Sequence, residues 1–368
     1  MSFNDVIGQE AAKAQVQAWI SAGRLPHAIL VCGPEGTGKR RFALELAKAC
    51  CCHAGGTDAC DACSSCRRVE QLAHPDLHLL VPAAPRSARK AKARDEGGEP
   101  EDPRAPVRDF LDGVAAPAGG NISVDLLRRL QDDMGYAPVE APRRLGLIFN
   151  ADMMHPAGAN ALLKVLEEPP RRAAFVLVTA APERLLPTVL SRCQRLTFRR
   201  LRPDEVRAHL TRQGVAGERL ELAVRLGAGS LDRAARVAGG ELDELRDQVE
   251  QFLTASIEAQ TTRYWELLDP LVAGGDRAAV QQFLTLVGVH LRDLFLLAHD
   301  RGDEVALLDR RPVLLALATR LDRGRLEQAA VEVDRANDYL GRNVNLNLVL
   351  TDLWRALSGA FTGRQAVC

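Results

Sequence analysis

Short apolar runs and helical repeats divide this chain into two kinds of region. Five apolar runs lie within the first 200 residues, and stretches with helical spacing separate them. Strands that are apolar on both faces are buried on both faces, so the alternation predicts a mainly parallel sheet in an α/β domain. The runs are HAILVCG (27–33), DLHLLVP (76–82), LGLIFN (145–150), AAFVLVTA (173–180) and RLTFR (195–199).

The helices expected between these strands carry their own start and stop signals. Ser123 is expected to cap a helix whose apolar face holds Leu127, Leu130 and Met134, and Gly135 follows it. A second helix, ANALLKVLEE, is expected to stop at the two prolines after it, because proline breaks a helix interior.

The rest of the chain is expected to be helical. PDEVRAHL starts a small helical segment that ends at two adjacent glycines, and later stretches such as AVQQFLTLVGVHLRDLFLLA repeat apolar residues at helical spacing. The length of 368 residues fits two or three domains. We therefore predict an α/β domain over 1–202, a small helical domain over 203–240 and an all-helical domain over 241–368.

Residues 82–120 interrupt the α/β pattern. The segment has six prolines and five glycines among 39 residues, and one aromatic residue. Such a composition buries too little apolar surface to order the chain, so a flexible insertion is expected. Its seven basic and seven acidic residues cancel, which favours a solvated loop over a DNA-binding arm.

Charge and composition exclude several classes of protein. Lys plus Arg equals Asp plus Glu, 48 against 48, so the chain lacks the net positive field of a protein that holds DNA alone. The start, MSFNDVIGQE, has neither the basic residues nor the apolar run of a secretion signal, and we recognise no membrane-spanning run. A cytoplasmic protein is expected, with partners sharing any contact with nucleic acid.

A phosphate-binding loop is expected between the first strand and its helix. GPEGTGKR has the glycines and the lysine of the motif G-x-x-x-x-G-K-[ST], in the strand-to-helix context that the motif requires. Backbone amides and the lysine of such a loop bind phosphate. A glycine-rich turn without a ligand is the alternative. The candidate nucleotide-binding residues are Gly33, Gly36, Gly38 and Lys39.

The magnesium side of this motif is altered. A hydroxyl residue should follow the lysine and help hold magnesium, but Arg40 stands there. An acid should end a neighbouring strand, where the apolar run ends in Phe149 and Asn150. Asp152 lies beyond the expected place and is predicted at the surface or as a helix cap. We expect no ATP hydrolysis by the chain alone, and ATP binding stays in doubt.

Six of the nine cysteines lie within 17 residues, which indicates a metal site in a reducing compartment. Four thiolates with this spacing suit a closed, structural zinc site, while an iron–sulfur cluster is the alternative. The predicted zinc ligands are Cys51, Cys60, Cys63 and Cys66. The first ligand stays open between Cys51 and its neighbours Cys50, Cys52 and His53. Zinc is expected to attach a small module, over about 50–67, to the α/β domain.

Together these motifs resemble one known family. FNDVIGQ, LPHAILVCGPEGTGK, the four-cysteine module, NALLKVLEEPP and LPTVLSRCQRLTF are similar to the bacterial clamp-loader branch of the AAA+ ATPases. The resemblance covers roughly residues 3–240. It implies an AAA+ P-loop domain with a zinc module, a small helical lid domain and a C-terminal helical collar domain that holds subunits in a ring.

Departures from the motor subunits of that branch indicate which kind of member this is. Motor subunits end the loop in Lys-Ser or Lys-Thr and the acidic strand in Asp-Glu, where this chain has Arg40 and Phe149-Asn150. An arginine position of the family's lid reads Asp232 here. The pattern is similar to an inactive, rigid subunit of the five-membered ring that opens a sliding clamp.

The resemblance also implies a working residue away from the loop. In the family, the arginine of SRC, here Arg192, reaches nucleotide bound by the adjacent motor subunit. Ser191 and Cys193 are expected to position it. An arginine finger acting in trans is worth about 10³ to 10⁵ in rate, and a guanidinium suits the charge on a γ-phosphate. The alternative is that Arg192 only caps its helix or pairs locally.

The partners implied by the resemblance are the other clamp-loader subunits of DNA polymerase III, of the gamma/tau and delta types, the sliding clamp and primer–template DNA. Any polymerase activity would belong to the assembly, because no carboxylate pair here suits two-metal nucleotidyl transfer. Two alternatives stay open: an active motor ATPase of the gamma/tau type, and a zinc-dependent DNA-binding protein of repair. Zero net charge disfavours the latter.

Overall fold

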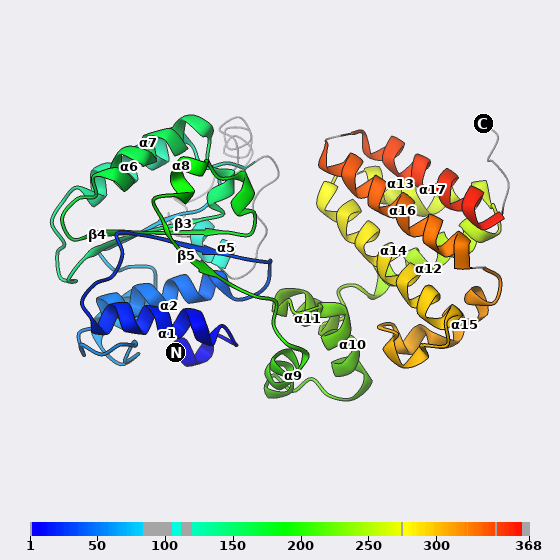
Figure 1. The fold of residues 1–368 in the computed structure, drawn as a ribbon, viewed down its shortest axis with the longest axis horizontal. Helices are drawn as coiled ribbons and strands as arrows, with labels where there is room; N and C mark the ends of the chain where they lie inside the picture. The colour runs from blue at the N-terminus through cyan, green and yellow to red at the C-terminus, as the bar shows by residue number, and fades with distance from the viewer. Residues whose placement is uncertain are drawn as a thin grey trace, which may run out of the picture. The chain divides into compact units, whose positions relative to one another are not determined.

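The computed structural model describes residues 2–83, 105–111, 120–273, 275–321, 323–342 and 344–362. The described chain divides into two compact units (Figure 1). The first unit comprises Met1–His209 with Gly229–Asp232, and the second comprises Leu210–Ala228 with Arg233–Cys368. The three domain boundaries expected from sequence stay a prediction.

A five-stranded sheet of parallel strands forms the centre of the first unit (Figure 1). Its strand order is β2-β3-β4-β1-β5, so β1 lies between β4 and β5. Each of the five predicted strands is confirmed, and β1, β3 and β4 are buried along their whole length. The strands are β1 (Ala28–Cys32), β2 (Leu77–Leu80), β3 (Arg144–Phe149), β4 (Ala173–Thr179) and β5 (Gln194–Thr197).

Helices cover both faces of this sheet and create two cores. Neighbouring residues of a strand point to opposite faces, so Ile29 packs with α1 and α2, while Leu30 packs with α6 and α7. The predicted cap of α6 is confirmed, because the Ser123 hydroxyl accepts a hydrogen bond from Leu126 N at 3.4 Å. The helices are η1 (Phe3–Asp5), α1 (Glu10–Ser21), α2 (Lys39–Cys51), α3 (Ser64–Glu70), α5 (Ala105–Leu111), α6 (Val124–Met134), η2 (Ala151–Met153), α7 (Pro156–Glu167), η3 (Pro182–Arg184) and α8 (Pro187–Leu190).

The predicted insertion leaves the sheet after β2. Ala83 and Asn121 form an antiparallel bridge at its base, with two backbone hydrogen bonds of 3.1 Å. Residues 84–104 and 112–119 lie outside the described chain. Between them, 105–111 form α5, a helix that the proline- and glycine-rich composition did not predict. Its buried residue, Phe110, is the single aromatic residue of the insertion.

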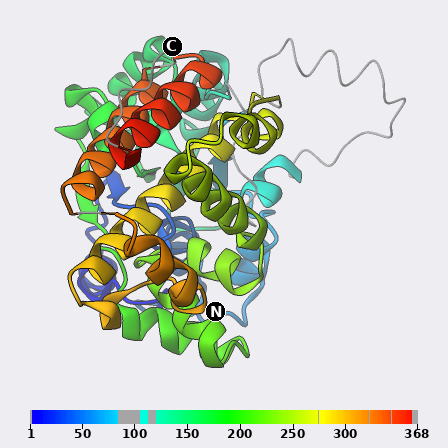
Figure 2. The same ribbon diagram turned by 90° about the vertical axis from the view of Figure 1, so that its right-hand side faces the viewer.

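The described part of the second unit consists of helices joined by turns and loops, as the apolar repeats predicted. Figure 2 shows its later helices, in yellow to red, from another side. α14 packs against α12, α13, α15 and α16. By length and composition α14 could cross a membrane, but 61% of its apolar window is buried, as in a core helix. The helices are α10 (Gly217–Gly227), α11 (Leu231–Ala238), α12 (Asp243–Ile257), α13 (Thr261–Ala273), α14 (Arg277–Ala298), η4 (Gly302–Glu304), η5 (Leu308–Arg310), α15 (Arg311–Ala318), α16 (Arg323–Gly341) and α17 (Leu346–Thr362); α9 (Pro203–Arg212) precedes them.

Candidate functional sites: the phosphate loop, the cysteine cluster and Arg192

The phosphate loop lies where the motif places it, between the end of β1 and the start of α2. Gly33, Gly36 and Gly38 all have positive φ, at 143°, 69° and 87°. A Cβ atom on Gly33 would lie 2.4 Å from the Phe198 carbonyl oxygen, and one on Gly36 would lie 1.9 Å from Ser230 Oγ. Glycine is therefore required at Gly33 by backbone conformation and by space, and at Gly36 by its positive φ.

Lys39 is turned into this loop. Lys39 is only 7% exposed, and its Nζ donates a hydrogen bond to the Pro34 carbonyl oxygen at 2.6 Å. Burial lowers the pKa of the Lys39 ammonium to about 8, against the opposing charges of Glu35 and Asp232. The lysine that should bind phosphate is thus bound to the loop itself.

The segment Gly229–Asp232 closes over the same loop. Leu231 N donates a hydrogen bond to the Gly36 carbonyl oxygen at 2.7 Å. Asp232, which stands at the family's arginine position, offers a negative charge near Lys39 and Arg40. The carboxylate of Asp232 thus lies near the two positively charged side chains of the loop, Lys39 and Arg40.

Both residues at the magnesium positions point into protein. Arg40 Nη1 donates to the Phe110 carbonyl oxygen at 2.9 Å, and its Cζ lies 3.8 Å from the centre of the Phe110 ring. Phe149 is fully buried at the end of β3. Asp152 was predicted at the surface or as a cap, but it accepts a hydrogen bond from Thr179 Oγ1 and joins the ends of β3 and β4.

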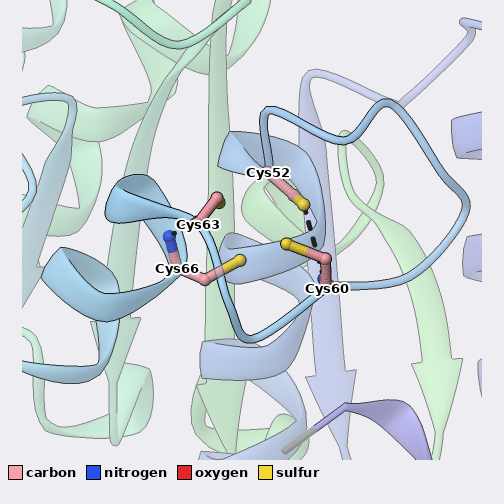
Figure 3. Close-up of side chains that lie close together, drawn as sticks. All are labelled: Cys52, Cys60, Cys63 and Cys66. Atoms are coloured by element: carbon pink, nitrogen blue, oxygen red, sulfur yellow. Dashed lines mark hydrogen bonds between the residues drawn. The ribbon is translucent and has the colours of Figure 1, made fainter.

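Four cysteines meet beside the C-terminus of α2 (Figure 3). Their sulfur atoms all lie within 4.8 Å of one another. Tetrahedral zinc with Zn–S bonds of about 2.3 Å needs sulfur separations of about 3.8 Å, so small side-chain movements allow these thiols to hold the ion. The group consists of Cys52, Cys60, Cys63 and Cys66.

The structure thus selects Cys52, an alternative that the spacing left open, in place of Cys51. Cys51 is the last, fully buried residue of α2, whereas Cys52 follows it in extended conformation, with φ of −65° and ψ of 128°. The Cys52 sulfur accepts hydrogen bonds from the amides of Ala54 and Cys60, both at 3.4 Å.

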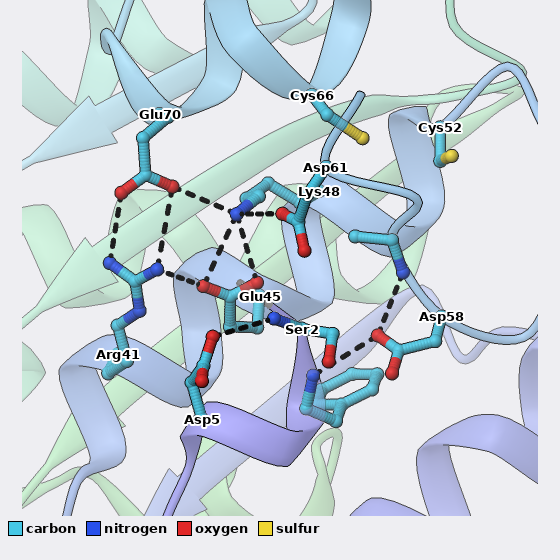
Figure 4. A network of polar contacts seen from close by, with 12 residues as sticks. Ser2, Asp5, Arg41, Glu45, Lys48, Cys52, Asp58, Asp61, Cys66 and Glu70 are labelled. Atoms are coloured by element: carbon cyan, nitrogen blue, oxygen red, sulfur yellow. Dashed lines mark hydrogen bonds and ion pairs between the residues drawn. The ribbon is translucent and has the colours of Figure 1, made fainter. Parts of the chain in front are cut away.

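A buried ion cluster attaches this module to α2, and sequence reasoning missed it (Figure 4). Lys48 Nζ lies 2.6 Å from Oδ1 of Asp61, a residue that stands between Cys60 and Cys63 in the sequence. The same Nζ lies 2.9 Å from Oε2 of Glu70 in α3. It also lies 3.2 Å from Glu45 Oε2, and Arg41 pairs with the same glutamate. Although burial opposes it, hydrogen bonding to Asp61 and Glu70 raises the pKa of Lys48.

Arg192 follows α8, and its side chain is 33% exposed. Its Nη2 lies 2.6 Å from Glu167 Oε1 of α7, and Nη1 donates to the Thr188 carbonyl oxygen at 2.9 Å and to Ser191 Oγ at 3.3 Å. Sequence reasoning did not single out Glu167 as its partner. Burial raises the pKa of the Cys193 thiol to about 11, which does not suit a nucleophile.

Comparison with known proteins places the chain in a family. The model of the family described as DNA polymerase III, delta subunit, matches residues 8–202. The chain belongs to this family. The match covers the phosphate loop, the four cysteines and Arg192.

Two curated relatives are likewise subunits of DNA polymerase III. The DNA polymerase III subunit delta' of Bacillus subtilis is 36% identical over 54% of this chain and 49% of its own length. Subunit tau of Escherichia coli is 31% identical over 74% of this chain and 41% of its own length. The chain thus spans less than half of these relatives. A gamma subunit-related protein of Thermotoga maritima superposes with a TM-score of 0.43 at 15% identity, over 95% of this chain and 99% of its own.

Proposed function

We propose that the chain is a delta-prime-type subunit of the DNA polymerase III clamp loader. In this role it hydrolyses no ATP itself, offers Arg192 to nucleotide on a neighbouring subunit and helps place the sliding clamp on primed DNA. Its partners are then gamma/tau and delta subunits, the clamp and primer–template DNA, in the cytoplasm. The B. subtilis delta' relative supports this assignment.

One observation carries the proposal against the motor alternative. Arg40 and Phe149 occupy both positions from which a motor subunit holds magnesium, and both are engaged with protein atoms. Phosphoryl transfer requires the metal to neutralise charge that develops on the phosphates. A chain with neither magnesium ligand in place is suited to a structural and activating role in the ring. The motor ATPase of the gamma/tau type is the second candidate, because the chain is also similar to tau subunits.

Arg192 supports the activating role. Its partial exposure leaves the guanidinium accessible, while Glu167 and the end of α8 hold it in place. An arginine that is held before it meets its substrate loses less entropy on binding. A γ-phosphate would replace the Glu167 ion pair with another charge-assisted hydrogen bond.

Zinc fits the same proposal as a structural ion. Cys52, Cys60, Cys63 and Cys66 would hold it with four thiolates, which leaves no open position for chemistry. Removal of the ion is expected to loosen the module, while Arg192 keeps its contacts with Glu167 and Thr188, which lie outside the module.

Reconstitution with motor subunits tests the proposal. The motor subunit next to this chain keeps its loop lysine, and the loop lysine is replaced in the other motor subunits. ATP hydrolysis is then measured at the one site that Arg192 is proposed to reach. Single-turnover hydrolysis is expected to fall by about 10³ to 10⁵ with Arg192→Ala. Arg184→Ala is the matched control, an exposed arginine of the same unit, and should leave the rate unchanged.

Two results would contradict the proposal. Unchanged hydrolysis in the Arg192→Ala ring removes the trans role. Magnesium-dependent turnover by the isolated chain, at a rate like that of the motor subunits, establishes the gamma/tau alternative. Gel filtration of each ring confirms that every variant still assembles.

A further inference from the structure

Phe110 of α5 joins the two altered positions of the magnesium site. Its backbone carbonyl oxygen accepts from Arg40, its ring lies under the guanidinium, and the same ring lies 5.9 Å from that of Phe149. Arg40 replaces the hydroxyl and Phe149 replaces the acid. A single side chain from the insertion therefore contacts both residues that replace the metal ligands.

The packing of α5 is specific to this place. Val107, Phe110 and Leu111 recur at helical spacing, and all three pack against the core that includes Phe42 and Phe149. Pro106, Arg108 and Asp109 of the same helix are exposed. Phe110 is 3% exposed, so burial of its apolar ring helps to keep α5 in position.

Arg40 adds an interaction that depends on this helix. A guanidinium over an aromatic face is attracted by the negative face of the ring, and the hydrogen bond to the Phe110 carbonyl oxygen fixes its direction. Asp232 and Glu35 supply negative charge near Arg40. The cation is thus satisfied within the protein.

The phosphate side of the loop is closed by other parts of the chain. Lys39 is bonded to Pro34, and Gly36 accepts from Leu231. A phosphate must displace the Lys39 contact to reach the ammonium, and it must also do without the metal. The loop and its surroundings thus form a site that the protein fills with its own atoms.

We infer that α5 is an internal plug, in which Phe110 occupies the metal side of the phosphate loop and keeps magnesium–ATP out. This deepens the proposed function by naming what suppresses nucleotide use in this subunit. The plug belongs to the isolated chain, whereas Arg192 acts on a neighbour's nucleotide. Either idea can therefore fail while the other stands.

Nucleotide binding to the isolated full-length chain tests the plug. The probe is a fluorescent N-methylanthraniloyl ATP, titrated with and without magnesium. The unaltered chain is expected to bind no tighter than about 1 mM, and Phe110→Ala is expected to bind about tenfold tighter or more, because the loop glycines and Lys39 are retained. Asp109→Ala, an exposed change on the same helix, should match the unaltered chain.

A further pair of variants separates the plug from the metal ligands. Adding Arg40→Ser to Phe110→Ala returns the hydroxyl of the motif, so magnesium should then strengthen binding severalfold. Phe110→Ala alone should show little magnesium dependence. Hydrolysis should stay absent in both, because Phe149 and Asn150 provide no acid.

The plug is overturned if the unaltered chain binds the probe at micromolar concentration, or if Phe110→Ala binds no tighter. Circular dichroism and zinc content check that Phe110→Ala is folded. If it is not, Arg40→Met tests the same contact, since it removes the guanidinium from the ring while keeping an apolar stem. In Arg40→Met the backbone amides of residues 105–111 should exchange hydrogen faster, and the chain should bind the ATP probe more tightly. If neither change is observed, the inference is refuted.

Discussion

Lys48→Met tests how the cysteine module is attached to the α/β unit. Lys48 is 2% exposed and Glu45 is fully buried, while the side chains of Asp61 and Glu70 are 27% and 44% exposed (Figure 4). Methionine keeps the helix propensity and most of the apolar stem. The change therefore removes the charge and little else.

The expected loss of stability in Lys48→Met depends on the carboxylates that remain after the lysine is removed. Removing one partner of a buried ion pair costs about 3 to 5 kcal/mol, because the other charge is left buried. Here Glu45 keeps Arg41 as a partner, and the two exposed carboxylates can turn to water. Burial already raises the pKa of Glu45 against the charges of Arg41 and Lys48. We expect a loss of roughly 2 to 3 kcal/mol in the stability of α2 and the module.

Native-state hydrogen exchange of the zinc-loaded chain measures this loss at the amides of α2. The matched control is Lys13→Met, because Lys13 pairs with Glu10 at the same i,i+3 spacing but Glu10 is 76% exposed; less than about 0.5 kcal/mol is expected there. The double variant Glu45→Leu with Lys48→Met should recover most of the loss. Equal effects at Lys48 and Lys13, or no recovery in the double variant, would refute the reasoning.

Two further predictions concern the other sites. Cys52→Ser should lower the zinc bound per chain and its resistance to chelators, whereas Cys51→Ser should keep nearly one zinc; the reverse result returns Cys51 to the ligand set. Burial lowers the pKa of Lys39 to about 8 in the folded chain. Between about pH 8 and 10.5 the folded state therefore binds fewer protons than the unfolded state, and the free energy of unfolding rises by about 3 kcal/mol across that window. Lys39→Met should abolish this gain in urea unfolding at successive pH values, and an unchanged pH profile would show that burial does not tune Lys39.

The sequence by itself determined the sheet, the loop and the family. β1, β3 and β4 are apolar runs that are buried along their whole length, and the pattern of apolar runs also located β2 and β5. The glycines of the loop were likewise readable, because positive φ and close backbone approach admit no other residue well. Arg40 and Phe149 could be recognised as departures from the motif because each stands at a fixed position, one directly after Lys39 and the other at the end of an apolar run.

Only the tertiary structure decided which groups meet. Cys50, Cys51 and Cys52 are adjacent, and the end of α2 rather than their spacing turns Cys52 toward the other three. Phe110 lies 70 residues from Arg40, within a segment whose composition predicted no structure. Contacts of this kind depend on side-chain direction and on packing between distant segments, and neither leaves a periodic signal in the chain.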